Sequence, residues 1–185
     1  SRNSLGRLRG LIADLNPDLI ASNEGGSNQL LVRAPARILE VRRLTLTARP
    51  ERRRLLWALV GNPDGRRLAV ANLHATSLDA RAAARDVELA AERSVDWAAG
   101  QPLVFGGDLN VRPEDDPGLY ERLRDRFALA PPTGPGALDH LLGRGLEPVE
   151  PPTQLAPEER DVSGPDGLRI RLSDHAPVVA SFGMK

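Results

Sequence analysis

The sequence predicts an α/β fold in which β-sheets pack face to face and helices lie on the outside. Three observations indicate this fold: β-rich runs recur between Pro and Gly residues, longer segments show helical periodicity, and the two kinds of segment alternate irregularly. Such irregular alternation is typical of sheets with many antiparallel pairings. The 185 residues suffice for one substantial core, so we expect a single domain over residues 1–185.

The N-terminal segment predicts a helix and then a short strand. From Ser4 to Leu15, leucine and isoleucine recur every three to four residues, and the first serine of this segment is a suitable N-cap. Asn16-Pro17 ends the helix, because the residue before a proline is pushed out of the helical region. Asp18–Ser22 is then a short strand that leads to Glu24, and Gly25-Gly26 forces a turn.

The central part predicts four strands and the longest helix. The β-rich runs are Gln29–Ala34, Arg37–Thr47, Arg54–Gly61 and Arg66–His74. Asn62-Pro63-Asp64-Gly65 is a strong hairpin signal between the last two runs. Asp79–Ala99 is rich in Ala, Glu, Leu and Arg and gathers its apolar residues on one side, so we expect a helix there.

The C-terminal half continues the alternation. Pro102–Phe105 is typical of a buried strand, and Asp116–Phe127 opens with Asp-Pro, a suitable first helical turn. Two more apolar strands are expected at Leu138–Leu142 and Pro177–Phe182. Glu147–Gly167 is so rich in Pro, Glu, Asp and Gly that we expect a long mobile loop there.

Composition and charge exclude several classes of protein. Lysine plus arginine and aspartate plus glutamate both number 25, so the net charge is zero, which argues against polyanion binding by bulk charge alone. Cysteine is absent, which excludes disulfide scaffolds, thiol catalysis and cysteine-based zinc sites. No apolar run approaches the roughly 20 residues of a membrane span. The chain does not begin with a signal peptide, so the cytoplasm is the default location, and a leader upstream of Ser1 is left open.

Several acids and histidines stand where apolar strands end. Polar groups at the rim of a core are costly to desolvate without partners, so their collection there needs a reason. These residues are Glu24, His74, Asp108, Asp139, Asp174 and His175. Taken alone, a histidine at the core edge such as His74 is more often satisfied by the backbone, and a lone glutamate such as Glu24 carries no signal.

Phe105–Asn110, with the sequence Phe-Gly-Gly-Asp-Leu-Asn, is the sharpest motif. Alternation along a strand points Asp108 and Asn110 to one face and anchors Leu109 on the other. The carboxylate can accept a proton from water, while the carboxamide can donate to a phosphoryl oxygen and orient that water. The two glycines allow a ligand or another backbone to come close. An isolated Asp-x-Asn is more often an Asx-turn at a strand end, and this alternative stays open.

His175 is expected to pair with an acid from another segment. Pro177 favours a junction of loop and strand, where the side chains of Asp174 and His175 can converge. A buried aspartate bonded to one imidazole nitrogen fixes the tautomer of the ring and raises its basicity, and we assign this role to Asp139. His140 points to the other face of its strand by alternation, so we interpret it as structural.

Taken in chain order, five segments resemble motifs of the endonuclease/exonuclease/phosphatase superfamily, the deoxyribonuclease I-like metal-dependent phosphohydrolases. The segments are Asp18–Glu24, Asn72–His74, Gly107–Asn110, Leu138–His140 and Ser173–His175. Each motif is short, but five in the right order at strand ends are specific, and together they span nearly the whole chain. The resemblance implies a four-layer α/β/β/α sandwich, in which two mixed β-sheets lie between flanking helices and the site lies at one edge.

The resemblance also implies catalytic roles. Asp108 matches the aspartate that activates or orients the attacking water, and Asn110 matches the asparagine that holds the phosphate and that water. Asp139 and His175 resemble the family's Asp–His pair, whose imidazole contacts the scissile phosphate, and His74 resembles a second phosphate-facing histidine. Whether Asp108 or His175 acts as the general base stays open.

A metal site is implied in the same way. Glu24 is similar to the family's metal-binding glutamate, and Asp174 to a carboxylate near the metal. Mg²⁺ is the expected ion, with Mn²⁺ as an alternative, because a hard cation suits carboxylate and phosphate oxygens. The family normally begins with a strand that carries a metal-site asparagine, and it has a long stretch after its glutamate. We expect this chain to lack both the N-terminal strand and the segment after Glu24.

The leading hypothesis is a Mg²⁺-dependent phosphoesterase that hydrolyses a phosphodiester with an activated water, with DNA or RNA as the default substrate. Seven arginines form either a phosphate-tracking stripe or a solvated strand face: Arg42, Arg43, Arg52, Arg53, Arg54, Arg66 and Arg67. Lipid phosphodiesters and small phosphoesters are alternative substrates. A non-catalytic binding module that retains the fold is the alternative from another class. No feature of the sequence indicates a protein partner.

Overall fold

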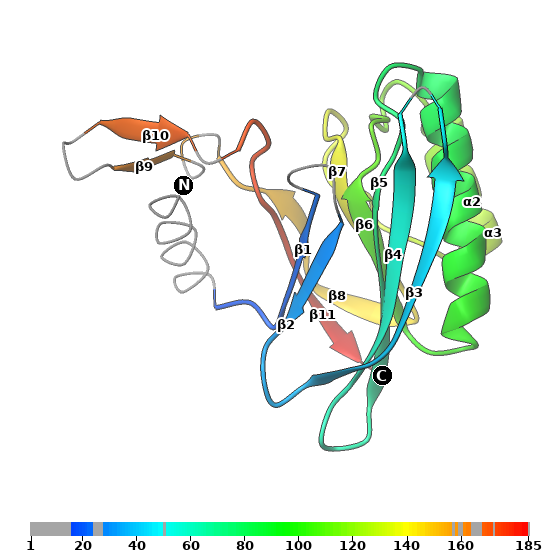
Figure 1. Cartoon of the computed structure of the whole chain (residues 1–185), viewed down its shortest axis with the longest axis vertical. Helices are drawn as coiled ribbons and strands as arrows, with labels where there is room; N and C mark the ends of the chain where they lie inside the picture. The colour runs from blue at the N-terminus through cyan, green and yellow to red at the C-terminus, as the bar shows by residue number, and fades with distance from the viewer. Residues whose placement is uncertain are drawn as a thin grey trace.

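Stacked layers of strands and helices make up the fold (Figure 1). The computed structural model describes residues 16–23, 28–49, 51–156, 158, 161–163, 168–171 and 173–184. The helix predicted over residues 4–15 and the predicted metal ligand Glu24 therefore lie outside the described residues. Within them, a five-stranded mixed sheet, further two-stranded sheets and two helices confirm the predicted α/β fold.

The central layer is a mixed sheet with the strand order β3-β4-β5-β6-β7. Its strands are β3 (Arg37–Thr47), β4 (Arg53–Gly61), β5 (Arg67–His74), β6 (Leu103–Asp108) and β7 (Asp139–Arg144). β5 and β6 run parallel, because the chain crosses back over the sheet between them, and the other neighbouring strands run antiparallel. The predicted hairpin turn joins β4 to β5, with Gly65 at a positive φ of 85°.

Two helices cover one face of this sheet (Figure 1). α2 (Ala80–Ala98) begins after Asp79, whose carboxylate accepts hydrogen bonds from two N–H groups of the first turn. α3 (Pro117–Phe127) begins with its proline after the capping residue Asp116. The main core lies between these helices and the sheet and includes Leu55, Trp57, Leu73, Phe105 and Leu142. Within the described segments, neither helix is long and apolar enough to cross a membrane.

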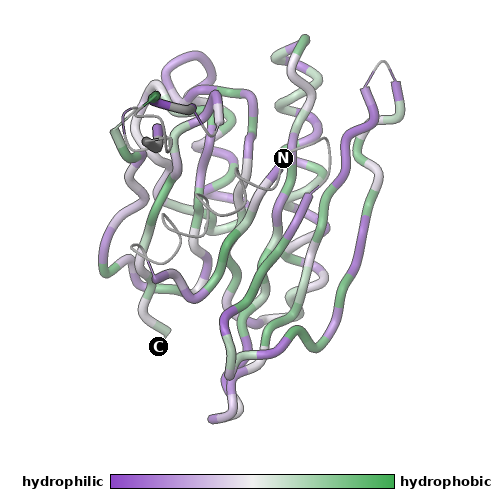
Figure 2. Tube along the Cα trace, turned by 60° about the vertical axis from the view of Figure 1, so that its left-hand side comes forward, coloured by the Kyte–Doolittle hydropathy of each residue, from purple (hydrophilic) through white to green (hydrophobic). Residues whose placement is uncertain are grey.

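Shorter strands form a third layer on the other face of the sheet (Figure 1). β1 (Leu19–Ser22) pairs with β2 (Gln29–Val32), and β8 (Leu146–Gln154) pairs with β11 (Val178–Met184), both antiparallel. A further antiparallel pair consists of β9 (Asp161–Ser163) and β10 (Arg169–Arg171). Figure 2 shows hydrophobic residues in green along the strands between the layers, whereas purple is frequent in the connecting turns.

Two asparagines fasten the β1–β2 hairpin to the central sheet. Asn72 on β5 is fully buried and donates its side-chain amide to a backbone oxygen on each strand of the hairpin. Asn23, which follows β1, donates to the Leu73 carbonyl oxygen at 3.0 Å. The residue before Glu24 is therefore fixed beside the residue before His74.

The predicted loop over Glu147–Gly167 is wrong where the structure has strands, at residues 147–154 of β8 and at residues 161–163 of β9. Residues 146–154 form strand β8, which contains Pro148, Pro151 and Pro152. Proline lacks the N–H group that a strand donates to its neighbours, so it is confined to edge strands and irregular positions. In the described part of the chain β8 pairs with β11 alone, and the register shifts on both sides of Ser181. This irregular edge pairing accommodates prolines that in the sequence indicate a loop.

Candidate active site

Three of the predicted site residues form a row across neighbouring strands. The register pairs His74 at the end of β5 with Asp108 at the end of β6, and Asp108 with Asp139 at the start of β7. Paired residues of neighbouring strands project to the same face of a sheet, so the three side chains share one face. The row lies at the edge where β5 and β6 end, the upper edge of the sheet in Figure 1.

His175 reaches this row from the loop before β11. Its Nδ1 lies 2.6 Å from Asp139 Oδ2. In the row itself, His74 Nε2 lies 3.4 Å from Asp108 Oδ2. Asp108, Asp139 and His175 each offer an oxygen or nitrogen atom within 4.8 Å of those of the other two. One phosphoryl group is wide enough to contact all three side chains.

The two histidines have different electrostatic environments. Burial lowers the pKa of His175, but the hydrogen bond and charge of Asp139 outweigh burial, so the pKa is raised above its ordinary value. Burial lowers the pKa of His74, and the charge of Asp108 offsets this only in part. Burial also raises the pKa of Asp139, against the hydrogen bond from His175. Because a carboxylate only accepts hydrogen bonds, His175 donates through Nδ1 and keeps Nε2 for another partner.

The strand ends at Asp108, so the predicted alternation to Asn110 is wrong. Asn110 has a left-handed backbone with φ 52°, and its N–H donates to Asp108 Oδ1 at 3.0 Å. This contact is the Asx-turn that the sequence left open. The turn brings the Asn110 side chain back to the strand edge, where Nδ2 donates to the Ala75 carbonyl oxygen at 3.0 Å. Leu109 is fully buried, as the sequence predicts.

The two glycines of the motif give room to neighbouring backbone. A Cβ on Gly106 would lie 1.9 Å from the carbonyl oxygen of His140 on β7. A Cβ on Gly107 would lie 2.1 Å from the carbonyl oxygen of Leu73 on β5, and Gly107 has a positive φ of 115°. The close approach of the flanking strands therefore requires both glycines. The sequence left open whether a ligand or another backbone comes close, and the structure shows neighbouring backbone at both glycines.

The two predicted metal ligands have different outcomes. Glu24 lies outside the described residues, and the structure places only its neighbour Asn23 at the sheet edge. Asp174 is exposed, directly before His175, and is not one of the three grouped residues of the described site. The N–H of His175 donates to Ser173 Oγ at 3.1 Å, which orders this loop beside the row.

His140 is buried on the face opposite Asp139, as the sequence predicts. Its Nδ1 accepts a hydrogen bond from the Thr133 N–H at 3.1 Å, so Nε2 carries the proton and lies 3.0 Å from the Ala137 oxygen. The Tyr120 hydroxyl lies 2.8 Å from the same Nε2. Burial lowers the pKa of His140 to about 4, so the ring is neutral at pH 7.

The sequence interpretation missed a buried acid on α2. The acids that the sequence analysis singles out all stand at strand ends, but Asp86 on α2 is only 3% exposed. Its carboxylate accepts hydrogen bonds from Thr76 and Thr47. The signal was available, because Asp86 lies three residues after Ala83 and four before Ala90, on the apolar side of the helix.

The seven arginines that the sequence offers as a phosphate-tracking stripe or a solvated face are spread along the sheet. The turn before β4 and the start of β4 place Arg52, Arg53 and Arg54 at the end where β5 finishes. Arg66 and Arg67 lie at the opposite end, in and after the hairpin turn. Arg42 and Arg43 lie between these ends, in the middle of β3, so only Arg52, Arg53 and Arg54 of the seven lie at the end that carries the acidic row.

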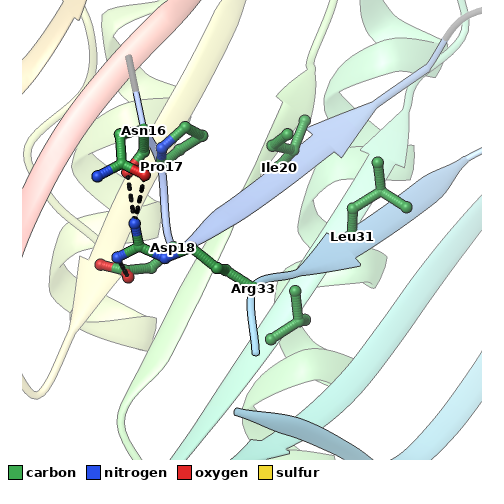
Figure 3. A pocket seen from close by; sticks show the side chains of 7 residues that line it. Asn16, Pro17, Asp18, Ile20, Leu31 and Arg33 are labelled. Atoms are coloured by element: carbon green, nitrogen blue, oxygen red, sulfur yellow. Dashed lines mark hydrogen bonds and ion pairs between the residues drawn. The ribbon is translucent and has the colours of Figure 1, made fainter. Parts of the chain in front are cut away.

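A cavity of about 270 Å³ lies elsewhere, on the β1–β2 hairpin. Figure 3 shows Arg33 with Asn16 and Asp18 at one side of the cavity, and Ile20 and Leu31 further along the two strands. Asp18 and Arg33 lie at the end of the hairpin opposite to Ser22, so this cavity is remote from the row of acids and histidines. Its polar lining residues are bonded to one another, because Arg33 donates to both Asn16 and Asp18.

Comparison with known families agrees with this geometry. Residues 2–175 match the sequence profile of the Endonuclease/Exonuclease/phosphatase family. The chain belongs to this family. Its fold is also that of solved members and relatives, although sequence identity to them is low. A search of curated proteins finds no match.

Three solved structures illustrate the shared fold. TDP2 of D. rerio, in complex with a single-strand DNA product, is 14% identical with a TM-score of 0.69, over 99% of this chain and 92% of that one. A mannosyl-6-phosphatase of Bacteroides thetaiotaomicron is 16% identical with a TM-score of 0.67, over 90% and 77%. The human Nocturnin catalytic domain, with a bound sulfate anion, is 13% identical with a TM-score of 0.65, over 96% and 76%.

Members of the Endonuclease/Exonuclease/phosphatase family generally depend on a divalent metal, and the described residues fit such an ion. Asp108 and Asp139 are directly paired across β6 and β7, and His175 completes a group with all ligand atoms within 4.8 Å. Neighbouring carboxylates repel each other, and their oxygens are the ligands that hard divalent cations prefer. The edge of the sheet therefore carries an acidic cluster that can hold a metal ion.

Proposed function

We propose that this protein is a magnesium-dependent hydrolase that cleaves a phosphodiester by attack of an activated water. The observation that carries the proposal is the meeting of Asp108, Asp139 and His175, from three distant parts of the chain, with reactive atoms within 4.8 Å. Carboxylates and an imidazole at this spacing can activate water and stabilise charge on one phosphoryl group. We also propose that residues 1–185 belong to one domain.

Asp139 and His175 act as a pair in this proposal. The carboxylate of Asp139 holds Nδ1 of the imidazole and raises the pKa of His175, so the ring is more often protonated near neutral pH. Nε2 then donates to a non-bridging phosphoryl oxygen, where negative charge grows as water attacks. His74, on the other side of Asp108, is a second contact to the phosphoryl group.

Asp108 and Asn110 act on the attacking water. The Asn110 N–H donates to Asp108 Oδ1, and Oδ2, which lies 3.4 Å from His74 Nε2, accepts the proton of a water molecule. The Asn110 amide uses one N–H on the Ala75 carbonyl and keeps the other for a phosphoryl oxygen. We therefore assign Asp108 as the general base and His175 as the group that stabilises the phosphoryl charge.

The proposed metal is Mg²⁺, with Mn²⁺ as a substitute. Asp108 and Asp139 supply carboxylates from the described residues, and Glu24 and Asp174 are the ligands that the sequence predicts. A bound cation offsets the repulsion between these carboxylates and an anionic substrate. The donor set of carboxylate oxygens favours a hard ion over a soft one.

Nucleic acid is the proposed substrate class. Arg52, Arg53 and Arg54 lie at the same end of the sheet as the acidic row, where they can contact phosphates next to the scissile one. The single-strand DNA product bound to D. rerio TDP2 supports this choice. The phosphatase of Bacteroides thetaiotaomicron supports small phosphoesters as the alternative, with lipid phosphodiesters as a third class to test.

A substrate panel tests the proposal. The purified protein is incubated with plasmid DNA, abasic duplex, single-stranded DNA, RNA, phospholipid and bis(p-nitrophenyl) phosphate, each with Mg²⁺, with Mn²⁺ and with excess chelator. Hydrolysis of a phosphodiester that stops in chelator is the expected result. If no substrate is hydrolysed and calorimetry detects no heat of Mg²⁺ or Mn²⁺ binding, the proposal is wrong and a non-catalytic binding module is favoured.

A further inference from the structure

Asp86 is a buried carboxylate that packs among apolar residues. It lies on the sheet-facing side of α2 together with Ala83, Val87 and Ala90, and it is 3% exposed. Its Oδ2 accepts hydrogen bonds from Thr76 N at 3.1 Å and Thr76 Oγ1 at 2.7 Å. Its Oδ1 accepts one from Thr47 Oγ1 at 2.6 Å. Burial of a carboxylate is costly unless hydrogen bonds compensate it, so we ask what these three bonds hold in place.

The three bonds hold the segment that follows His74. Thr76 is next to Ala75, whose N–H donates to the Asp108 carbonyl oxygen at 2.9 Å. The Ala75 carbonyl oxygen in turn accepts the hydrogen bond from Asn110 Nδ2 at 3.0 Å. A continuous chain of contacts therefore runs from Asp86 through Thr76 and Ala75 to Asn110.

Asn110 depends on such support. Asparagine adopts a left-handed backbone more readily than other residues that have a side chain, but the direction of its amide still depends on the groups that bond to it. Two hydrogen bonds hold Asn110 in this structure, one to the Asp108 carboxylate and one to the Ala75 carbonyl. The direction of the Asn110 amide therefore depends on the position of the Ala75 carbonyl oxygen.

We propose that Asp86 is a positioning residue for the active site: its hydrogen bonds to Thr76 fix the Ala75 carbonyl, which aims the amide of Asn110 at the substrate. The role rests on the hydrolase function proposed above, although Asp86 itself contacts neither substrate nor metal. It requires an acceptor on residue 86 and does not require a negative charge. A merely structural Asp86 would stabilise the fold without affecting the geometry of Asn110.

Substitutions at position 86 separate the two roles. Asp86→Leu keeps the branched shape of the side chain, with a larger volume, and removes all three acceptor contacts. We expect kcat to fall about tenfold to a hundredfold with KM little changed, as for a displaced catalytic group. Asp86→Asn keeps an acceptor for Thr76 and is expected to retain kcat within about threefold. Ser94→Ala is the matched control, because Ser94 is fully buried on the same helix and its hydroxyl has no hydrogen-bond partner among the described residues.

A double-mutant cycle with Asn110→Ala tests the route of the effect. If Asp86 acts through Asn110, Asp86→Leu lowers kcat much less in the Asn110→Ala background, while its effect on Tm is the same in both backgrounds. Equal loss of kcat in both backgrounds, or equal loss in Asp86→Asn and Asp86→Leu, overturns the proposal. If Asp86→Leu does not fold, Thr76→Val removes the hydroxyl contact alone and enters the same cycle.

An NMR measurement tests the positioning role of Asp86 without relying on enzyme activity. The side-chain amide signals of Asn110 are assigned by their loss in Asn110→Ala, and no substrate or metal is added. We expect these signals to shift or broaden in Asp86→Leu and to keep their positions in Asp86→Asn and Ser94→Ala. Unchanged signals in Asp86→Leu overturn the positioning role even if the enzyme is active. An inactive wild type with shifted signals contradicts the proposed hydrolase and leaves the coupling established.

Discussion

Two histidines beside the start of β7 occupy opposite environments. His175 bonds to the Asp139 carboxylate, and its side chain is 36% exposed at the edge of the sheet. His140 follows Asp139 directly, yet it is buried on the other face, where Thr133, Ala137 and Tyr120 surround its ring nitrogens. The comparison shows that the partner and the exposure of an imidazole decide what it can do. A carboxylate and an open side make His175 a candidate for catalysis, whereas a full set of structural bonds removes His140 from it.

The strongest test of the comparison is the removal of the His175 side chain. We expect His175→Ala to lower kcat on the identified phosphodiester by about two to four powers of ten, the usual contribution of a positioned acid–base group. Its Tm should change little, because the ring is partly exposed. The measurement is steady-state hydrolysis with Mg²⁺ alongside thermal unfolding. Turnover at the wild-type rate would remove His175 from the mechanism.

Replacement of His140 should have the opposite effects, with a large loss of stability and little loss of kcat. His140→Ala removes a buried ring and leaves the Thr133 N–H and the Tyr120 hydroxyl without this partner. We expect the free energy of unfolding to fall by about 3 kcal/mol, with kcat of the folded fraction within about threefold of wild type. Urea unfolding followed by fluorescence measures the first quantity. A stable but inactive variant would show that His140 belongs to the site.

The pH dependence of the two rings should also have opposite signs. The pKa of His175 is raised, so its contribution to stability is present below the unfolded pKa of about 6.5 and is lost as the pH rises through the folded pKa. The pKa of His140 is lowered to about 4, so its contribution is present above about 6.5 and is lost as the pH falls toward 4.

Histidine NMR titration without divalent cations checks these directions. We expect a midpoint above 6.5 for His175 and one near 4 for His140. Asp139→Asn should lower the midpoint of His175 and leave that of His140 in place. A common midpoint for both rings would contradict the difference in their environments.

The smallest expected effect is on DNA binding, when single arginines at the two ends of the sheet are replaced. Arg54 is the second residue of β4, at the end that carries the acidic row, and Arg66 lies at the other end, in an ion pair with Asp64. If nucleic acid is the substrate, Arg54→Ala should weaken DNA binding a few-fold and reduce the slope of log K against log salt by about one, because one phosphate contact is lost. Arg66→Ala is the matched control and should leave both quantities unchanged. Equal effects would indicate bulk charge in place of a defined phosphate contact.

The row of His74, Asp108 and Asp139 can be predicted from the sequence, because each of its residues lies at the end or the start of a strand. His74, Asp108 and Asp139 each stand where an apolar run stops or starts, and that pattern is visible without coordinates. The assignment of Asp139 to His175 used tautomer chemistry and alternation, and the structure brings the two side chains together at 2.6 Å. The roles given to these residues remain predictions until activity is measured.

Features that depend on tertiary contacts were not predictable in the same way. The prolines of β8 indicate a loop until the edge pairing with β11 is known. The left-handed turn at Asn110 follows from its bonds to Asp108 and Ala75, which alternation along a strand does not consider. The position of Asp86 on the apolar side of α2 is visible in the sequence, but its acceptor role is not, because that role depends on a threonine ten positions away.

Because of Gly106 and Gly107, β6 cannot gain or lose a residue without disturbing its contacts with β5 and β7. Their lack of side chains lets β5 and β7 approach closely, and this nesting locks the alignment that sets Asp108 between His74 and Asp139. An insertion of one residue upstream would turn the carboxylate toward the helices and press a side chain into a neighbouring carbonyl. Homologous proteins can therefore vary the hairpin after β4 in length far more freely than the six residues of β6.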